Sequence, residues 1–569
     1  MLDIMENENS QQSEFTGKGI LERHEYLVGE RRVWDRLHQD IRELIRPNAK
    51  DFYKTDTSGL ERTQRIFDDS PMYFLEAAVS GIDSSVFDPS GRFFEVAARN
   101  PKTMQDPLKV AYLESVTEAH YYYLNKPEAK FNSNKHELLL DLMAFGTGVM
   151  HRYWDYENSV IRFRTIPLAD CYIDQDNNGE IDTVSREIIF TKRQAIQEYG
   201  IDNLPKKIRE AKSDHEKFTF IHHVCPRTDW DRNAISDRRY RFASIHVAKE
   251  DKSIVKESGF RYFPYLVPRW YTLAGEVYGR SPVMNCIQNI RVLQACSRDM
   301  LEMADFMIRP PIQVIDEALV EKNLNWLPSQ IIKVQPGMGE DAIKQLHVGG
   351  NMPISRELIQ DVLHKISRAL YNDVFEAADF GNRDRVTKEE TMSVQRSKLK
   401  KLSPIFGRLH AEILTPLIKG NDLILRSNET STFKVFPEPP SDMSQDELVM
   451  EFLSPAAMAQ KGEKAMNSLQ LFQLTAPLMQ QDPTLMDGLD MKGIFQDIAL
   501  SINIDRRRMR SPEEMQQIED DRAQQQQQAQ MMQAAPGLAG AMKDVASANK
   551  DNSASGGAGA LPSIPNLGF

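Results

Sequence analysis

The acidic and amide side chains that best match the spacing of metal ligands lie at Asp174–Gly179. The order Asp174-Gln-Asp176-Asn-Asn178-Gly179 matches the first half of a calcium-binding loop, whose carboxylate and amide oxygens coordinate the ion. The twelfth position of such a loop is a bidentate glutamate, but here it is Ser185. Strand-forming residues also flank the run where helices are required. We therefore interpret this segment as the polar turn of a β-hairpin.

Other potential metal or phosphate ligands are found at three further places. His222 and His223 precede Cys225, but adjacent residues of a strand point to opposite faces, so we predict a strand with one buried histidine. Cys286 and Cys296 lie ten residues apart on an expected helix, where we interpret them as small core residues. The basic cluster at residues 506–508 is interpreted as a solvated or ion-paired face, with phosphate contact as the alternative.

Familiar catalytic motifs are missing from the sequence. It contains no Gly-x-x-x-x-Gly-Lys-Ser/Thr phosphate loop, no Gly-x-Ser-x-Gly and no His-Glu-x-x-His. We therefore expect neither enzymatic activity nor a cofactor. Function must be inferred from the elements that position the side chains.

The composition indicates a large folded protein. With 569 residues, of which 41% are hydrophobic and 27% charged, the chain is not wholly disordered and has room for several domains. The net charge of −12 argues against a protein that scans DNA, which needs a basic face, but not against one that conducts DNA without gripping it. Four scattered cysteines without a Cys-x-x-Cys pair favour a reducing compartment.

We expect a soluble protein made inside the cell. The polar start of the chain does not resemble a secretory signal. The longest apolar stretch, Leu138–Met150, is interrupted by Asp141 and is shorter than the roughly 20 residues that span a bilayer.

Near residue 150 the sequence pattern changes from helical spacing to strand-forming composition. Residues 1–20 are expected to form a flexible leader, and residues 21–150 are expected to be helical, with apolar residues at helical spacing. One such series is Val33, Leu37, Ile41 and Ile45. Residues 151–270 contain short runs rich in β-branched and aromatic residues between turn signals, which predicts strands and hairpins.

Two long helices are predicted next. Ser281-Pro282 is a favourable helix start, and apolar residues then recur every three or four positions until Pro310-Pro311. After a Pro/Gly-punctuated insert, a second helix is predicted over residues 353–378. Its apolar face comprises Ile359, Val362, Ile366, Leu370 and Val374.

The last third of the chain is predicted to be more varied. A capping box at Thr387–Glu390 opens a third helix, which Pro404 and Pro416 should kink. A strand pair is expected at Leu423–Arg426 and Thr432–Phe436. Helices are expected to resume near Gln445 and to continue into a Gln-rich helix over 511–534. Residues 535–569 are expected to be disordered.

Three segments, in this order, carry a resemblance to a known family. They are Phe260-Arg-Tyr-Phe-Pro264-Tyr265-Leu-Val-Pro-Arg269-Trp270 with Gly275-Glu276-Val-Tyr278-Gly279-Arg280-Ser281-Pro282; Arg385-Val-Thr387-Lys-Glu-Glu390 with Leu402-Ser-Pro404-Ile-Phe-Gly407-Arg408-Leu409 and Leu414-Thr-Pro416-Leu417-Ile418; and Phe452-Leu-Ser-Pro455-Ala-Ala-Met-Ala459-Gln460. The set resembles the head-to-tail connecting (portal) proteins of short-tailed, double-stranded DNA bacteriophages, over most of residues 20–525. The C-terminal low-complexity tail departs from the family pattern.

The resemblance implies a mainly α, α+β fold with the parts of a portal protein. The expected parts are a wing (21–280), stem helices (281–309 and 353–378) with a clip between them (310–352), a channel loop (379–386), a wing helix with a strand pair (387–444), a crown (445–510), a Gln-rich helix (511–534) and a tail (535–569). It also implies a ring of about twelve subunits around a central channel at one capsid vertex.

Several partners follow from the same resemblance. They are further copies of the chain, the terminase motor, tail or adaptor proteins, capsid and scaffolding proteins, and double-stranded DNA passing without sequence specificity. The protein would assemble in the host cytoplasm, reside in the virion and need no membrane. Two alternatives remain: another phage ring adaptor or scaffold, or a DNA-packaging enzyme.

Two sets of residues are assigned roles within this scheme. Ile287, Ile290, Ile366 and Leu370 are expected to pack helix against helix around the ring. Asn382, Arg383 and Arg385 are expected in the channel loop, where the arginines, repeated around the ring, would contact DNA phosphates. The alternative is a plain connector in which these arginines pair with Asp379 and Asp384.

Overall fold

The computed structural model describes most of the first 430 residues. The described ranges are 15–53, 65–87, 92–100, 106–231, 237–309, 312–315, 331–334, 343–345, 352–375, 402–427 and 448–453, with single positions 63, 436, 438, 440, 518, 521, 522, 524 and 525. The predicted channel loop, most of the crown, the basic cluster at 506–508 and the tail lie outside the described residues. Within the described part, no helix is both long and apolar enough to cross a membrane.

Four long helices dominate the first 150 residues, as the sequence predicts. They are α1 (Gly17–Leu44), α2 (Ser70–Val86), α3 (Pro107–Asn125) and α4 (Phe131–Phe145). Helix α1 begins inside the expected leader, because the Thr16 side chain accepts a hydrogen bond from the Gly19 amide and caps the helix. Val33 is 85% exposed and lies off the buried stripe to which we assigned it.

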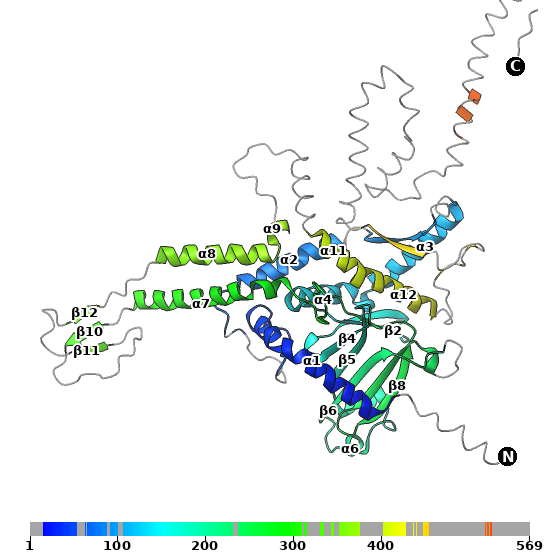
Figure 1. Ribbon diagram of the computed structural model, residues 1–569, viewed down its shortest axis with the longest axis horizontal. Helices are drawn as coiled ribbons and strands as arrows, with labels where there is room; N and C mark the ends of the chain where they lie inside the picture. Colours follow the sequence, from blue (N-terminus) through cyan, green and yellow to red (C-terminus); the bar gives the residue numbers. More distant parts are fainter. Residues whose placement is uncertain are drawn as a thin grey trace, which may run out of the picture.

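Strands predominate among the described residues between 150 and 266, which confirms the predicted change from helices to strands. Strand β2 (Met150–Asp155) lies between β3 (Val160–Thr165) and β9 (Tyr265–Leu266). A five-stranded antiparallel meander follows chain order and crosses the lower part of Figure 1. It comprises β4 (Cys171–Gln175), β5 (Ile181–Thr191), β6 (Lys217–Pro226), β7 (Phe242–Ala248) and β8 (Ser253–Phe260), with short helices α5 (Lys192–Tyr199) and α6 (Lys206–Arg209).

Helix α1 is fastened to this sheet by a buried arginine. The Arg31 guanidinium donates hydrogen bonds to the carbonyls of Leu168, Ala169 and Cys171 and lies 3.9 Å from the centre of the Tyr172 ring. Asp35, one turn further along α1, accepts a hydrogen bond from Arg31 Nε at 2.9 Å. These partners compensate the buried charge of Arg31. The same hydrogen bonds join α1 to the β part of the body.

The segment after residue 400 differs from its prediction. Helix α11 (Ser403–Leu409), a π-helical turn (His410–Leu414) and α12 (Thr415–Ser427) follow one another. The predicted strand at Leu423–Arg426 is wrong, because these residues belong to α12. Asp422 and Arg426 pair at 2.7 Å with helical i, i+4 spacing, a signal that the sequence contained.

A strand stands where helices were expected to resume. Strand β13 (Leu448–Phe452) pairs antiparallel with β1 (Phe94–Ala98), itself a strand within the region predicted to be helical. The two strands form a sheet of their own. Each segment is a strand because it pairs with a partner about 350 residues away, and the local spacing of apolar residues does not predict such a pairing.

Candidate functional site

An arm of two antiparallel helices projects from the body. Helix α7 (Pro282–Ile308) leads outward and α8 (Met352–Ala369) returns beside it (Figure 1). Ser281 caps α7 by accepting a hydrogen bond from the Met284 amide at 3.0 Å, and Pro282 occupies the first turn, as the sequence predicts.

A small sheet forms the far end of this arm. Its strands are β10 (Ile312–Ile315), β11 (Ile331–Val334) and β12 (Ile343–Gln345). Strand β10 lies in the middle, parallel to β11 and antiparallel to β12. These strands pair only with one another in the described part of the chain. The three described strands of the insert therefore form a sheet of their own, which we call the tip.

The four residues predicted to pack around the ring are buried within the single chain. Ile287, Ile290, Ile366 and Leu370 are at most 4% exposed and belong to one core cluster. The start of α7 contacts α1 and α4, and α8 contacts α2, so this end of the arm is inside the body. The expectation that these side chains contact a neighbouring subunit is therefore corrected: they have no surface left to offer.

The second arm helix is shorter than predicted. It ends at Ala369, and Tyr371 has a φ of 63°, so the chain turns before α9 (Asn372–Phe375). Beyond the turn, the Asn372 side-chain amide donates a hydrogen bond to the carbonyl of Phe74 in α2 at 3.0 Å. The arm is thus anchored to the body just after α8 ends. The channel-loop residues Asn382, Arg383 and Arg385 lie outside the described residues.

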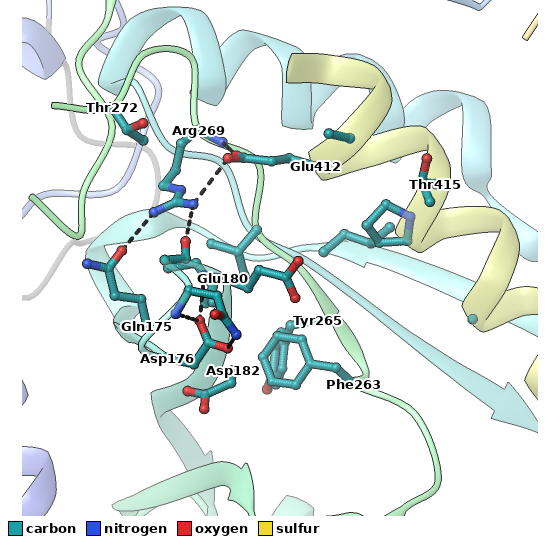
Figure 2. Close-up of a pocket in the computed structure, with 18 of the residues that line it drawn as sticks. Gln175, Asp176, Glu180, Asp182, Phe263, Tyr265, Arg269, Thr272, Glu412 and Thr415 are labelled. Carbon is teal, nitrogen blue, oxygen red and sulfur yellow. Dashed lines mark hydrogen bonds and ion pairs between the residues drawn. The ribbon is translucent and has the colours of Figure 1, made fainter. Parts of the chain in front are cut away.

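A buried arginine joins three segments where the chain enters α7. Arg269 Nη1 donates to Gln175 Oε1 at 3.1 Å, and Nη2 donates to the Gly179 carbonyl at 2.7 Å (Figure 2). Nη2 also pairs with Glu412 at 3.1 Å, and the Arg269 amide donates to the same carboxylate at 2.6 Å. Arg269 therefore links the β4–β5 turn, the segment that leads into α7 and the helix that follows residue 402.

Glu412 reaches Arg269 from a π-helical turn that Pro416 explains. Proline has no N–H to donate, and in a regular α-helix its ring would collide with the carbonyl four residues earlier, which belongs to Glu412. The wider turn avoids this collision, and the Thr415 amide instead donates to the His410 carbonyl. Pro416 was expected to kink the helix, and in the structure it is preceded by a π-helical turn.

A second buried arginine holds the same helix just beyond Pro416. Arg152 donates to the carbonyls of Pro416 and Leu417 at 2.6 and 2.9 Å and to that of Phe263 at 3.1 Å. Burial lowers the pKa of Arg152 to about 10. Its guanidinium fits because Gly420 has no side chain: a Cβ there would stand 1.7 Å from Arg152 Nη2.

The two arginines line an open groove of about 1030 Å³. Its wall includes the β4–β5 turn, the 261–276 segment and one side of the helix over 404–423. Glu412 neutralises Arg269, and Asp176 accepts hydrogen bonds from the Asn178 and Glu180 amides of its own turn. Asp176 thus stabilises a hairpin turn, as predicted, rather than a calcium loop.

The predicted histidine strand is β6, and both of its histidines are buried. His222 stacks on His246 of β7 with ring centres 4.1 Å apart, and it is hydrogen bonded to Tyr265 and Ser244. His223 lies on the opposite face, near His24 of α1. Among the described residues, no group of three or more His, Cys, Asp or Glu side chains could hold a metal ion. Cys286 is buried and Cys296 is half-buried, and neither forms a disulfide.

Sequence reasoning did not identify Arg152, Arg269, Glu412 or Gly420 as residues that hold the helical segment 403–427 against the body. Their partners lie far away in sequence; Arg269 and Glu412, for example, are 143 residues apart. The available signal was Pro416, which marks where the helix must deviate.

Comparisons with known proteins identify the family of the chain. Residues 17–509 match the family described as "Bacteriophage head to tail connecting protein". The chain is 27% identical to the "Probable portal protein" of Bordetella phage BPP-1, over 80% of this chain and 81% of that protein. It is 26% identical to the "Portal protein" of Salmonella phage epsilon15, over 90% of this chain and 92% of that protein. The chain belongs to the family of bacteriophage head-to-tail connecting proteins.

Proposed function

We propose that this connecting protein is the portal of a bacteriophage. In this proposal, about twelve copies form a ring at one capsid vertex, DNA is packaged and later ejected through the channel, and capsid and tail proteins attach to the ring. The observation that carries the proposal is the two-helix arm with its three-stranded tip, in a chain whose family match covers residues 17–509.

The arm suits a channel wall for a physical reason. A head-to-tail contact that closes on itself makes a ring, and helices running along the ring axis then surround a duct. The tip would stand at one end of this duct, where the terminase motor would dock during packaging. Assembly would take place in the host cytoplasm, with scaffolding and capsid proteins, and the finished ring would remain in the virion.

The channel loop keeps its proposed role in DNA retention. Arg383 and Arg385, repeated around the ring, would form a positive belt that grips phosphates weakly and less at high salt. Replacing both with alanine should leave rings intact and reduce retention of packaged genomes, most visibly at low salt. Unchanged retention would favour the plain connector, in which the arginines pair with Asp379 and Asp384.

Electron microscopy of the purified full chain tests the portal proposal. We expect negatively stained rings of about twelve subunits with a central channel. Monomers at all concentrations would contradict the ring. An ATPase and nuclease assay of the same sample separates a portal from a packaging enzyme, because only the enzyme would turn over ATP or cleave DNA.

A further inference from the structure

The arm leaves apolar side chains exposed where it extends beyond the body. On α7 and α8 these include Leu301, Met307, Ile308 and Leu358. Leu301 is 59% exposed and Leu358 is 47% exposed in the single chain. Nearby charges are already used within the arm, since Arg298 pairs with Asp299 and Lys365 with Asp361. Within the described part of the chain, these two leucines are therefore exposed apolar surface.

The two leucines lie at nearly the same height along the arm. Leu301 is seven residues before the end of α7, and Leu358 is six residues after the start of α8. At 1.5 Å per residue, both stand roughly 10 Å from the tip end of the helices. Rotation about an axis parallel to the arm does not change a residue's position along that axis. Leu301 of one copy therefore lies at the same position along the axis as Leu358 of the next copy.

They also lie on opposite flanks of the arm. On α7, Met300 packs against the core cluster that also contains Ile359 and Val362 of α8, and Leu301 follows Met300 by one residue, about 100° round the helix. On α8, Leu358 precedes the buried Ile359 by one residue, about 100° in the other sense. Because the helices are antiparallel, opposite senses of rotation place the two leucines on opposite flanks. A head-to-tail contact needs this arrangement of two different faces on one chain.

We propose that Leu301 on one copy packs against Leu358 on the next, closing the ring through the stem. This inference rests on the proposed ring and assigns its contact residues. The partner is a second copy of this chain because equal height and opposite flanks are what rotational symmetry requires. A two-fold contact would instead pair like residues with one another.

Paired substitutions test the contact. Leu301→Asp and Leu358→Asp, each in the full chain, should remain monomeric by sedimentation velocity, with circular dichroism confirming that both fold. Mixed in equal amounts, they should form dimers and no rings, since one intact Leu301 face meets one intact Leu358 face. Leu423→Asp is the matched control, because Leu423 is also 47% exposed but lies in α12, and it should form normal rings.

The outcomes separate this inference from the proposed function. Normal rings from both single variants would overturn the leucine contact and leave the portal proposal standing, and so would a mixture that stays monomeric. A wild-type chain that never forms rings would overturn both.

Crosslinking tests the height directly. Cysteines at 301 and 358 of one chain should give a ladder of oligomers with a short bismaleimide, above the background of the wild-type chain. Cysteines at 308 and 358 should not, because Ile308 lies on the same flank as Leu301 but seven residues, roughly 10 Å, nearer the tip. Equal ladders from both pairs would refute the proposed register.

Discussion

Three histidines packed inside the β part of the body should make the fold sensitive to acid. His222 stacks on His246, Tyr199 is hydrogen bonded to His246 at 3.0 Å, and the rings of His151 and Tyr265 are 4.7 Å apart. Burial lowers the pKa of His151 and of His246 to about 3 and that of His222 well below its usual value. The guanidinium of Arg186 lowers all three further, and Lys256 also acts on His246.

The direction of the pH effect follows from these shifts. In the unfolded chain these histidines have a pKa of about 6.5, so below that pH they bind protons that the folded chain does not bind. Their contribution to the free energy of unfolding is therefore fully present above pH 6.5 and decreases toward pH 3. Each histidine contributes about 1.4 kcal/mol per pH unit in this window. Urea unfolding of His246→Gln at several pH values should give a smaller slope of unfolding free energy against pH. The decrease should correspond to about one fewer proton bound on unfolding. The same slope change in the exposed control His215→Gln would contradict this explanation.

A side chain at Gly420 would collide with the Arg152 guanidinium, which hydrogen bonds to three backbone carbonyls hold in place. Gly420→Ala should destabilise the protein by about 1–3 kcal/mol through overpacking, measured by urea unfolding. Gly407→Ala in α11 is a matched control, since a Cβ there meets nothing within 4 Å. It should be neutral or slightly stabilising, because alanine favours a helix. Equal losses for both would mean that helix propensity, not Arg152, decides the result.

At the scale of elements, the π-turn and its arginine clamp should hold α11 in place. Glu412→Gln keeps the shape of the side chain but removes the charge opposite Arg269. We expect a loss of about 2 kcal/mol and faster amide exchange over 403–414 than over 415–427, because Arg152 still holds α12. Asp361→Asn, which breaks an exposed pair with Lys365, should cost well under 1 kcal/mol. Uniform exchange changes along 403–427 would contradict a local clamp.

Elements whose signals are local could be predicted from the sequence. The Ser281-Pro282 start of α7 and the change to strands near residue 150 depend on capping and periodicity, and both are confirmed. The β1–β13 pair and the Arg269–Glu412 contact depend on residues far apart in sequence, so no window of the chain contains them. Ile287, Ile290, Ile366 and Leu370 of the arm were recognised as buried, but periodicity does not tell which chain buries them.

At the scale of the whole molecule, the tip should be exchangeable. Its three strands pair with one another, and the two arm helices bring its ends together. Replacing residues 310–351 with an unrelated small domain should leave ring formation intact, seen by electron microscopy, and abolish docking of the packaging motor. Continued DNA packaging by the exchanged ring would show that the motor docks elsewhere.

The β1–β13 pair also imposes a schedule on synthesis. The ribosome makes residues 94–98 about 350 residues before their strand partner, which at roughly 5–20 residues per second is a delay of roughly 20–70 s. During that interval one edge of β1 is covered by α3, whose Tyr121 hydroxyl and Thr117 hydroxyl accept hydrogen bonds from the Phe94 and Val96 amides. The other edge waits for β13, and an unpaired edge is prone to join other chains. Nascent chains on one polysome would then be open to mispairing until translation passes residue 452.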